Sequence, residues 1–352
     1  MAPLVDNDTK LIKEHLQNEH EQFQRLVAPS ADNWKFRLHP IIFPYVLGYN
    51  LLGFYGGYLL LYAKYQTVLF TLFLVIPSML GLGAGVHRLW SHRAFKVKPQ
   101  LEILLIFFYL LTNQRSIVTW ARRHRLHHQC ADTDADPHNA TRGFFFSQYG
   151  WMVVEPHPEV VKREKHIDVS DLMKNPIIRF QEKYIVPLVA LIAFGFPTFV
   201  ATTFWGESLH IAFFVNYFRT NLVMNMINLI NSAAHLIGYK PIDQTAVGTQ
   251  SQGLGLIIFG EGFHNYHHTF PYDYRSSEFG DIKYNLSALF IEFMAKIGWA
   301  YDLKVTSENV IRNRVLKKGD GTDMYYIPNN QKKQDFFGTN YFKPREQEKL
   351  PD

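Results

Sequence analysis

The stretch that decides the fold is residues 41–86, IIFPYVLGYNLLGFYGGYLLLYAKYQTVLFTLFLVIPSMLGLGAGV. Its only charged residue, Lys64, lies between two apolar runs, 41–63 and 66–86. Each run is longer than about 20 residues, which is enough to cross a hydrocarbon core about 30 Å thick. Because only Lys64 and Tyr65 separate the two runs, the sequence predicts a membrane-spanning helical hairpin with a tight turn.

A second pair of apolar runs covers 184–204 and 209–230, and Arg219 is the only charged residue in either run. The short segment 205–208 between them predicts a second hairpin. Residues 87–183, between the hairpins, contain 15 lysines and arginines, whereas the two turns contain only Lys64. The positive-inside rule therefore predicts that 87–183 and both chain termini lie in the cytoplasm.

One further apolar stretch, 101–111, is too short to be another span. At about 1.5 Å per residue it reaches only about 17 Å, and it contains Glu102. A crossing at this point would place the histidine motifs on either side of it in different compartments. We therefore expect an interfacial or re-entrant helix.

These runs predict an all-α integral membrane protein with four transmembrane helices in two hairpins and a cytoplasmic helical cap. The predicted segments are a cytoplasmic N-terminal segment (1–40), the first hairpin (41–86), a cap segment with the interfacial helix (87–183), the second hairpin (184–235), a second cap segment (236–310) and a polar C-terminal tail (311–352). The first forty residues are polar and hold no apolar stretch of the kind found in a cleavable signal.

The composition agrees with a membrane protein that has a basic cytoplasmic face. The chain has 352 residues, of which 47% are hydrophobic, and a net charge of +5. No nucleic-acid-binding motif accompanies this charge, so we expect no nucleic acid partner. Cys130 is the only cysteine and cannot form an internal disulfide; we interpret it as incidental and not as a metal ligand.

Histidines are concentrated in three short motifs: HRLWSH at 87–92, HRLHH at 124–128 and HNYHH at 264–268. The second and third repeat an i, i+3, i+4 spacing, which places three rings on one helix face. Imidazole is a common ligand of transition metals, and one metal such as zinc takes about four ligands. Eight clustered histidines, joined by His235, therefore predict a dinuclear metal site. The scattered histidines are predicted not to bind metal: His15, His20, His39, His138, His157, His166 and His210.

The fourth apolar run carries a polar stripe whose members recur at steps of three or four residues: Asn221, Asn225, Asn228, Asn231 and His235. Such a stripe must face the interior of the bundle, either to hydrogen-bond between spans or to reach a site. Because the stripe ends on the cytoplasmic side, we predict that His235 is a metal ligand and that Asn231 holds a metal-bound water.

The three motifs, in this order around two hairpins, resemble the histidine boxes of the membrane-bound acyl-CoA desaturases, the stearoyl-CoA desaturase family. Three further runs match the pattern of that family: DTDADPHNATRGFFFS at 132–147, NSAAHLIGYKP at 231–241 and FGEGFHNYHHTFPYDYR at 259–275. The resemblance covers most of residues 35–310. It implies a multi-pass protein of the endoplasmic reticulum whose cap holds a diiron site. By this resemblance the iron ligands are His87, His92, His124, His127, His128, His235, His264, His267 and His268, with Asn231 acting through water.

The implied reaction is the O2-dependent introduction of a double bond into a long-chain saturated acyl-CoA. An unactivated methylene offers no acidic proton and no electrophile, so oxidation is the available route. The resemblance also implies electrons from NADH through cytochrome b5 and its reductase. Hydrogen-bonding groups beside the ligands must orient so many imidazoles, and we expect Glu261, Asp134 and Asp136 to do so.

The sequence departs from the family pattern at Arg123, Glu155 and Pro156, in regions implied to touch the CoA headgroup. The GTQ segment at 248–250 favours an insect-type enzyme that acts at Delta-11 or Delta-9, as in pheromone precursor synthesis. For the acyl tunnel, Gly81, with Gly83 and Gly85, predicts a close approach of a backbone or a slender ligand, and a tunnel end near Gly81 and Ser78.

Two alternatives fit parts of the pattern. A membrane diiron fatty acyl or sterol hydroxylase would use similar boxes but would leave oxygen in the product. A histidine-rich metal transporter belongs to a different class and would place its ligands near the bilayer midplane, in broken helices. The motifs here lie just outside the predicted spans, on one side.

Overall fold

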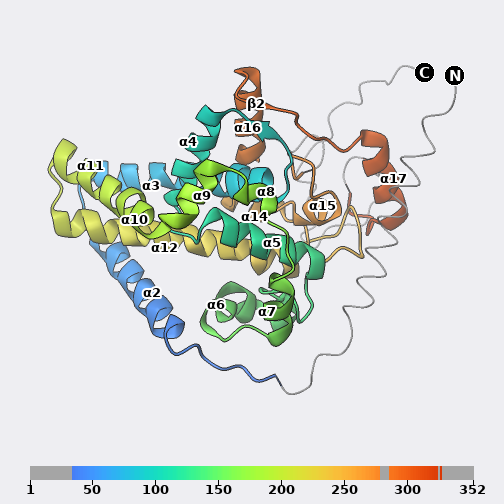
Figure 1. Ribbon diagram of the computed structural model, residues 1–352, viewed down its shortest axis with the longest axis horizontal. Coiled ribbons are helices and arrows are strands. Elements are labelled where there is room, and N and C mark those ends of the chain that lie inside the picture. The colour runs from blue at the N-terminus through green and yellow to red at the C-terminus, as the bar shows by residue number, and fades with distance from the viewer. Residues whose placement is uncertain (1–33, 278–284, 324–325, 327–352) are drawn as a thin grey trace.

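The computed structural model of the protein describes residues 34–277, 285–323 and 326, and these residues are mostly helical. His15 and His20, and most of the predicted N-terminal segment, lie outside the described residues. In Figure 1, α3 (Tyr65–Leu80), α11 (Phe196–Trp205) and α12 (Leu209–Asn231) lie side by side at the left, whereas α15 (His264–Thr269) and α17 (Glu308–Lys318) lie at the right.

The two predicted helix pairs are present. In the first, α2 (Ile42–Leu59) is followed by a turn and by α3, which continues without a break as the π-helix η1 (Gly81–Ser91). In the second, α10 (Ile185–Val189), the π-helix η4 (Ala190–Gly195) and α11 form one helical run. Gly206, at φ 61°, then reverses the chain, and the Ser208 side chain caps α12 by accepting the Ile211 N–H at 3.1 Å.

Two helical runs, Tyr65–Ser91 and Ile185–Trp205, are long and apolar enough to cross a membrane. Their partners α2 and α12 are less apolar, since α2 contains Asn50 and α12 contains Arg219 and several asparagines. These polar groups face the bundle: Asn221 donates to Asn50 Oδ1 at 2.9 Å. The predicted inward orientation of the asparagine stripe is therefore confirmed at this point of contact between α2 and α12.

The fully buried Arg219 connects the helices of both hairpins. Its guanidinium donates to the carbonyl of Leu111 at 2.8 Å, to the carbonyl of Ala193 at 3.1 Å and to Ser78 Oγ at 3.0 Å. The Ala193 carbonyl belongs to η4, where the wider π-helical turn changes the ordinary pattern of backbone bonds. Arg219 therefore holds α3, the C-terminal end of α4 (Pro99–Leu110) and the run Ile185–Trp205 against α12.

The apolar stretch at 101–111 forms α4 (Pro99–Leu110), a helix of 12 residues. Its Leu101 and Leu105 are fully buried, and the helix packs against α3 and η1. A Cβ added at Gly81 would lie 2.2 Å from the Tyr109 backbone nitrogen, so the predicted close approach of a backbone is confirmed there.

The remaining elements form the region around the histidine motifs. They are β1 (Lys96–Val97), α5 (Ile117–Cys130), η2 (Ala140–Arg142), η3 (Phe146–Gly150), α6 (Trp151–Val153), α7 (Pro158–Glu164), α8 (Ser170–Met173), α9 (Pro176–Lys183), α13 (Ala233–Leu236), α14 (Gln252–Ile257), α16 (Leu286–Lys296) and β2 (Ala300–Tyr301). The strands β1 and β2 pair antiparallel.

Ile311 and Val315 of α17 share a buried apolar cluster with Tyr266 and Phe270, so the predicted boundary at residue 310 falls inside a packed helix.

Candidate metal centre

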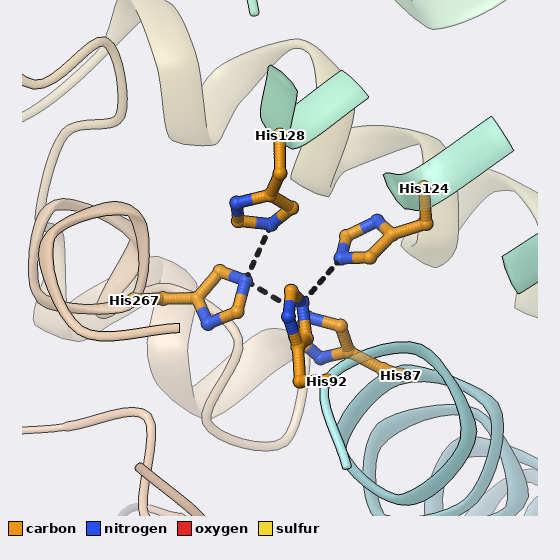
Figure 2. A group of neighbouring side chains, drawn as sticks. All are labelled: His87, His92, His124, His128 and His267. Carbon is orange, nitrogen blue, oxygen red and sulfur yellow. Dashed lines mark hydrogen bonds between the residues drawn. The ribbon is translucent and has the colours of Figure 1, made fainter. Parts of the chain in front are cut away.

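All nine histidines predicted to bind metal gather in two neighbouring groups. The five-histidine group consists of His87, His92, His124, His128 and His267, and the four-histidine group consists of His127, His235, His264 and His268. Within each group, one nitrogen from every ring lies within 4.8 Å of the others. Figure 2 shows the five-histidine group, with rings from three separate helices pointing toward a common centre.

The π-helix η1 explains how the HRLWSH motif contributes two rings. On an α-helix, residues five apart do not share a face, because the turn repeats every 3.6 residues. A π-helix closes its hydrogen bonds from i to i+5, and the His92 N–H donates to the His87 carbonyl at 3.2 Å. The two ring centroids are 5.0 Å apart as a result.

The i, i+3, i+4 motifs on α5 and α15 each contribute to both groups. On α5, His124 and His128 enter the five-histidine group and His127 enters the four-histidine group. On α15 the assignment is reversed: His267 enters the five-histidine group, and the other two histidines of the motif, His264 and His268, enter the four-histidine group. The i and i+4 rings therefore enter one group and the i+3 ring enters the other, so each helix motif contributes to both groups.

The Nε2 atoms converge in both groups. His267 Nε2 lies 2.9 Å from the Nε2 atoms of both His87 and His128. In the four-histidine group His264 Nε2 lies 3.1 Å from His235 Nε2 and 3.0 Å from His268 Nε2. A neutral imidazole carries one N–H and one lone pair, so several rings that meet through Nε2 cannot all satisfy one another. A metal cation between them can, and the donor set therefore fits transition metals.

Three carboxylates fix which nitrogen of a ring carries its proton. His87 Nδ1 lies 2.8 Å from Glu261, His127 Nδ1 lies 2.9 Å from Asp136, and His235 Nδ1 lies 3.2 Å from Asp132. Each pairing places the proton on Nδ1 and leaves the Nε2 lone pair for a metal. Of the carboxylates expected here from the sequence, Glu261 and Asp136 contact histidines. Asp134 instead pairs with Arg142 at 2.7 Å, and sequence reasoning missed Asp132.

Electrostatics keeps most of these rings neutral, as metal binding requires. Burial, reinforced by the neighbouring imidazoles, holds the pKa well below its usual value in His124, His128, His264, His267 and His268. Burial also opposes ionisation of Glu261, but the adjacent Arg88 and His87 outweigh it and lower the Glu261 pKa to about 2. For His127, burial lowers the pKa and the Asp136 carboxylate more than offsets this, so the pKa is raised.

His138, predicted to be a scattered histidine, lies beside the four-histidine group. Its Nδ1 is 3.7 Å from Asp136 Oδ1, and its ring centroid is 5.5 Å from that of His127. His127, Asp136 and His138 together form a further set of donors close enough to hold a metal. Two other scattered histidines act as helix caps: the Nδ1 atoms of His39 and His157 accept backbone N–H groups at the starts of α2 and α7.

A cavity of about 510 Å³ opens onto both groups, a size usual for small-molecule sites. His87 and His124 reach it from the five-histidine group, and His127 and His264 reach it from the other. Asn231 also lines it, at the end of α12. The apolar wall comes from α2, η1, the run Ile185–Trp205 and α12, and includes Val46, Leu82, Val189, Phe194, Met224 and Ile227.

The cavity does not reach the position predicted for the tunnel end. Leu82 lines it from η1, but Gly81 and Ser78 are absent from the lining among the described residues. Gly81 faces the Tyr109 backbone, and Ser78 hydrogen-bonds Arg219. At the polar side, Arg123 lines the cavity and pairs with Glu164 at 3.2 Å.

Comparison with known proteins agrees with this site. The family described as "Fatty acid desaturase" matches residues 63–301. The chain is 46% identical to an acyl-CoA Delta(11) desaturase of Choristoneura rosaceana, over 92% of this chain and 96% of that protein. It is 48% identical to a (11Z)-hexadec-11-enoyl-CoA conjugase of Bombyx mori, over 90% and 96% respectively. It is also 44% identical to an acyl-CoA Delta-9 desaturase of Acheta domesticus, over 80% and 78%.

Proposed function

This chain belongs to the fatty acid desaturase family, and on that premise we propose that its two histidine groups form a diiron centre acting on an acyl chain in the adjoining cavity. The chain is an acyl-CoA desaturase and thus an oxidoreductase. The observation that carries the diiron proposal is that both histidine groups open onto one cavity. A substrate methylene held there would lie beside both metal positions.

The proposed ligands are the nine histidines of the two groups, with Asn231 positioning a water at the four-histidine group. Two irons, when bound, supply the activation of O2 and the removal of two neighbouring hydrogens from the acyl chain. The protein residues hold the rings in place: Glu261, Asp132 and Asp136 each accept an Nδ1–H. Trp120 also stacks on His124, with ring centroids 4.8 Å apart.

The cavity wall determines which methylene is presented to the histidines. An apolar wall excludes water and limits the number of conformations of the acyl chain, which favours reaction at one position. Acyl-CoA is the substrate class given by the names of the relatives. We propose a long-chain saturated acyl-CoA, and Delta-11 activity in particular, since relatives from Choristoneura rosaceana, Spodoptera littoralis and Trichoplusia ni are named Delta(11) desaturases.

Expression in a desaturase-deficient yeast tests this function. Derivatised fatty acids analysed by mass spectrometry should contain a new double bond, at the eleventh carbon for Delta-11 activity. A hydroxylase would produce an alcohol instead, and its product would not be two mass units lighter than the substrate. Such a product would contradict the desaturase assignment. A double bond at the ninth carbon would overturn only the Delta-11 proposal.

For the membrane arrangement we propose four spans in the endoplasmic reticulum, made by α2, the run from α3 through η1, the run from α10 through α11, and α12. Both termini and the histidine groups face the cytoplasm, where cytochrome b5 and its reductase would deliver electrons from NADH. Glycosylation acceptors inserted at 64–65 or 206–207 should be modified in the lumen, whereas an acceptor at residue 116 should not. Modification at residue 116 would contradict this topology.

A further inference from the structure

The two histidine groups differ in the charge that surrounds them. One carboxylate, Glu261, touches the five-histidine group through His87. Two carboxylates, Asp132 and Asp136, touch the four-histidine group through His235 and His127. All three accept an Nδ1–H, so the difference lies in their number and in what neutralises them.

Glu261 is neutralised by a buried arginine. Arg88 is fully buried, and its guanidinium lies 2.8 Å from Glu261 Oε1, on the opposite oxygen from the one that accepts from His87. The same nitrogen, Nη2, also donates to Asn285 Oδ1 at 3.1 Å, and Nη1 donates to the Tyr274 carbonyl at 2.9 Å. The net charge of the Arg88–Glu261 pair beside the five-histidine group is therefore zero.

Asp132 and Asp136 lack such a cationic partner among the residues that the structure describes. In the described part of the chain, no lysine or arginine forms an ion pair with either residue. Asp136 accepts the backbone N–H groups of Asp132 at 2.8 Å and of His138 at 2.9 Å, and Asp132 accepts the N–H of Ala140 at 3.0 Å. These bonds stabilise two anions without cancelling their charge.

We infer that the two metals are electronically unequal, and that the metal of the four-histidine group is the harder one to reduce. A carboxylate on Nδ1 makes the imidazole a stronger electron donor, and its negative charge favours the more oxidised metal. Both effects act twice at the four-histidine group, whereas Arg88 offsets them at the other. Arg88, Glu261, Asp132 and Asp136 are positioning residues that set this difference. The first electron delivered to the oxidised centre is therefore held in the five-histidine group.

The inference rests on the proposed diiron function, and the two can be tested separately. The full-length chain is purified in lipid nanodiscs and loaded with 57Fe, and its iron content is measured. Fewer than two irons per chain would contradict the diiron proposal. The loaded protein is then reduced stepwise in the presence of redox mediators. Mössbauer spectra give the ferrous fraction at each potential, and electron paramagnetic resonance detects the half-reduced state. Two separate reduction steps are expected; one shared step, with two irons bound, would overturn the inference.

Two substitutions give opposite expectations. Asp136→Asn removes a negative charge from the four-histidine group, so the lower of the two reduction potentials should rise. The difference between the two potentials should therefore narrow. Glu261→Gln leaves the Arg88 cation beside the five-histidine group without its counter-charge, so the higher reduction potential should rise. The difference between the two potentials should therefore widen. A purely structural role would not move the two steps in this pattern. If both substitutions change the separation in the same direction, the inference fails.

A matched control and a second variant complete the test. Asp134→Asn makes the same change two residues from Asp136, at a carboxylate that pairs with Arg142, and should leave both steps unchanged. If Asp136→Asn does not retain two irons, Asp132→Asn provides the same comparison through His235 and should also narrow the separation. An unchanged separation in that variant would equally contradict the inference.

Discussion

The five-histidine and four-histidine groups are built from the same two helices but are not equivalent. Both take rings from α5 and α15, whose motifs have identical spacing. The third contributor differs: η1 gives two rings to the first group, and α13 gives the single ring of His235 to the second. The repeated motif gives three rings to each group, because α5 and α15 divide their rings between the groups in opposite ways, so the inequality comes entirely from the third contributor.

Removal of one ring should produce the largest difference between the groups. His235→Ala leaves three imidazoles in the four-histidine group, whereas His92→Ala leaves four in the other. We expect His235→Ala to lose one iron and to lower activity by more than about 100-fold. This loss exceeds the one typical for a residue that only hydrogen-bonds a metal ligand. His92→Ala should retain more iron. Iron content and desaturated product, measured together, check this.

His157→Ala is the control for this pair, because His157 is buried and caps α7 but belongs to neither histidine group. It should retain two irons and near-normal activity. Full activity in His235→Ala would remove this residue from the ligand set. Equal iron loss in the two ligand variants would mean that the number of rings does not distinguish the groups.

The carboxylates should give the next largest effect. Asp132→Asn keeps a side chain of the same shape but no longer holds the Nδ1 proton of His235 with a full charge. Outer-shell changes of this kind typically cost about 10–100-fold in metal affinity or activity. Iron titration of the purified variant measures this affinity, with Asp134→Asn as the control. Equal affinity in the two variants would show that Asp132 does not support its histidine.

The six rings of the second and third motifs could be expected from the sequence because their spacing is local, whereas His235 was predicted from the polar stripe that it ends. An i, i+3, i+4 pattern is a property of one helix, and its meaning does not depend on the rest of the fold. The HRLWSH motif was harder to interpret, since its five-residue step brings two rings together only on a π-helix. Nothing in the sequence of 81–91 alone distinguishes that helix from an ordinary one.

Contacts made by loops were missed because they depend on backbone conformation and tertiary position. Asp132 adopts a positive φ of 58° immediately after α5, which brings its carboxylate to His235 across more than 100 residues of sequence. Asp134 has the same chemistry but points to Arg142. The cavity could not be located from the sequence for a similar reason, since its wall combines residues from α2, η4 and α12 that no sequence pattern relates.

His138 offers a sharper test of whether the second group has four rings or five. Its Nδ1 lies 3.7 Å from Asp136, which is longer than a hydrogen bond. We therefore expect His138→Ala to retain two irons and to lower activity by less than roughly tenfold, since it removes a supporting contact and not a ligand. Loss of one iron in this variant would make the two groups equal in ring number.

The smallest effect on total activity is expected in the cavity that both groups share. Phe194 lines it from η4, and Phe194→Ala should lengthen the space available to the acyl chain while leaving every histidine in place. One methylene in an apolar pocket is worth only about 1–3 kcal/mol of discrimination, so the product profile should shift toward longer chains without an all-or-none change. Leu191→Ala is the matched control on the same π-helical turn, because Leu191 is 64% exposed and does not line the cavity. Acyl chains of graded length, supplied to both variants, measure the profile. If iron content stays at two and the profile of Phe194→Ala matches that of Leu191→Ala, the acyl chain lies elsewhere and the two groups do not share this cavity as a substrate site.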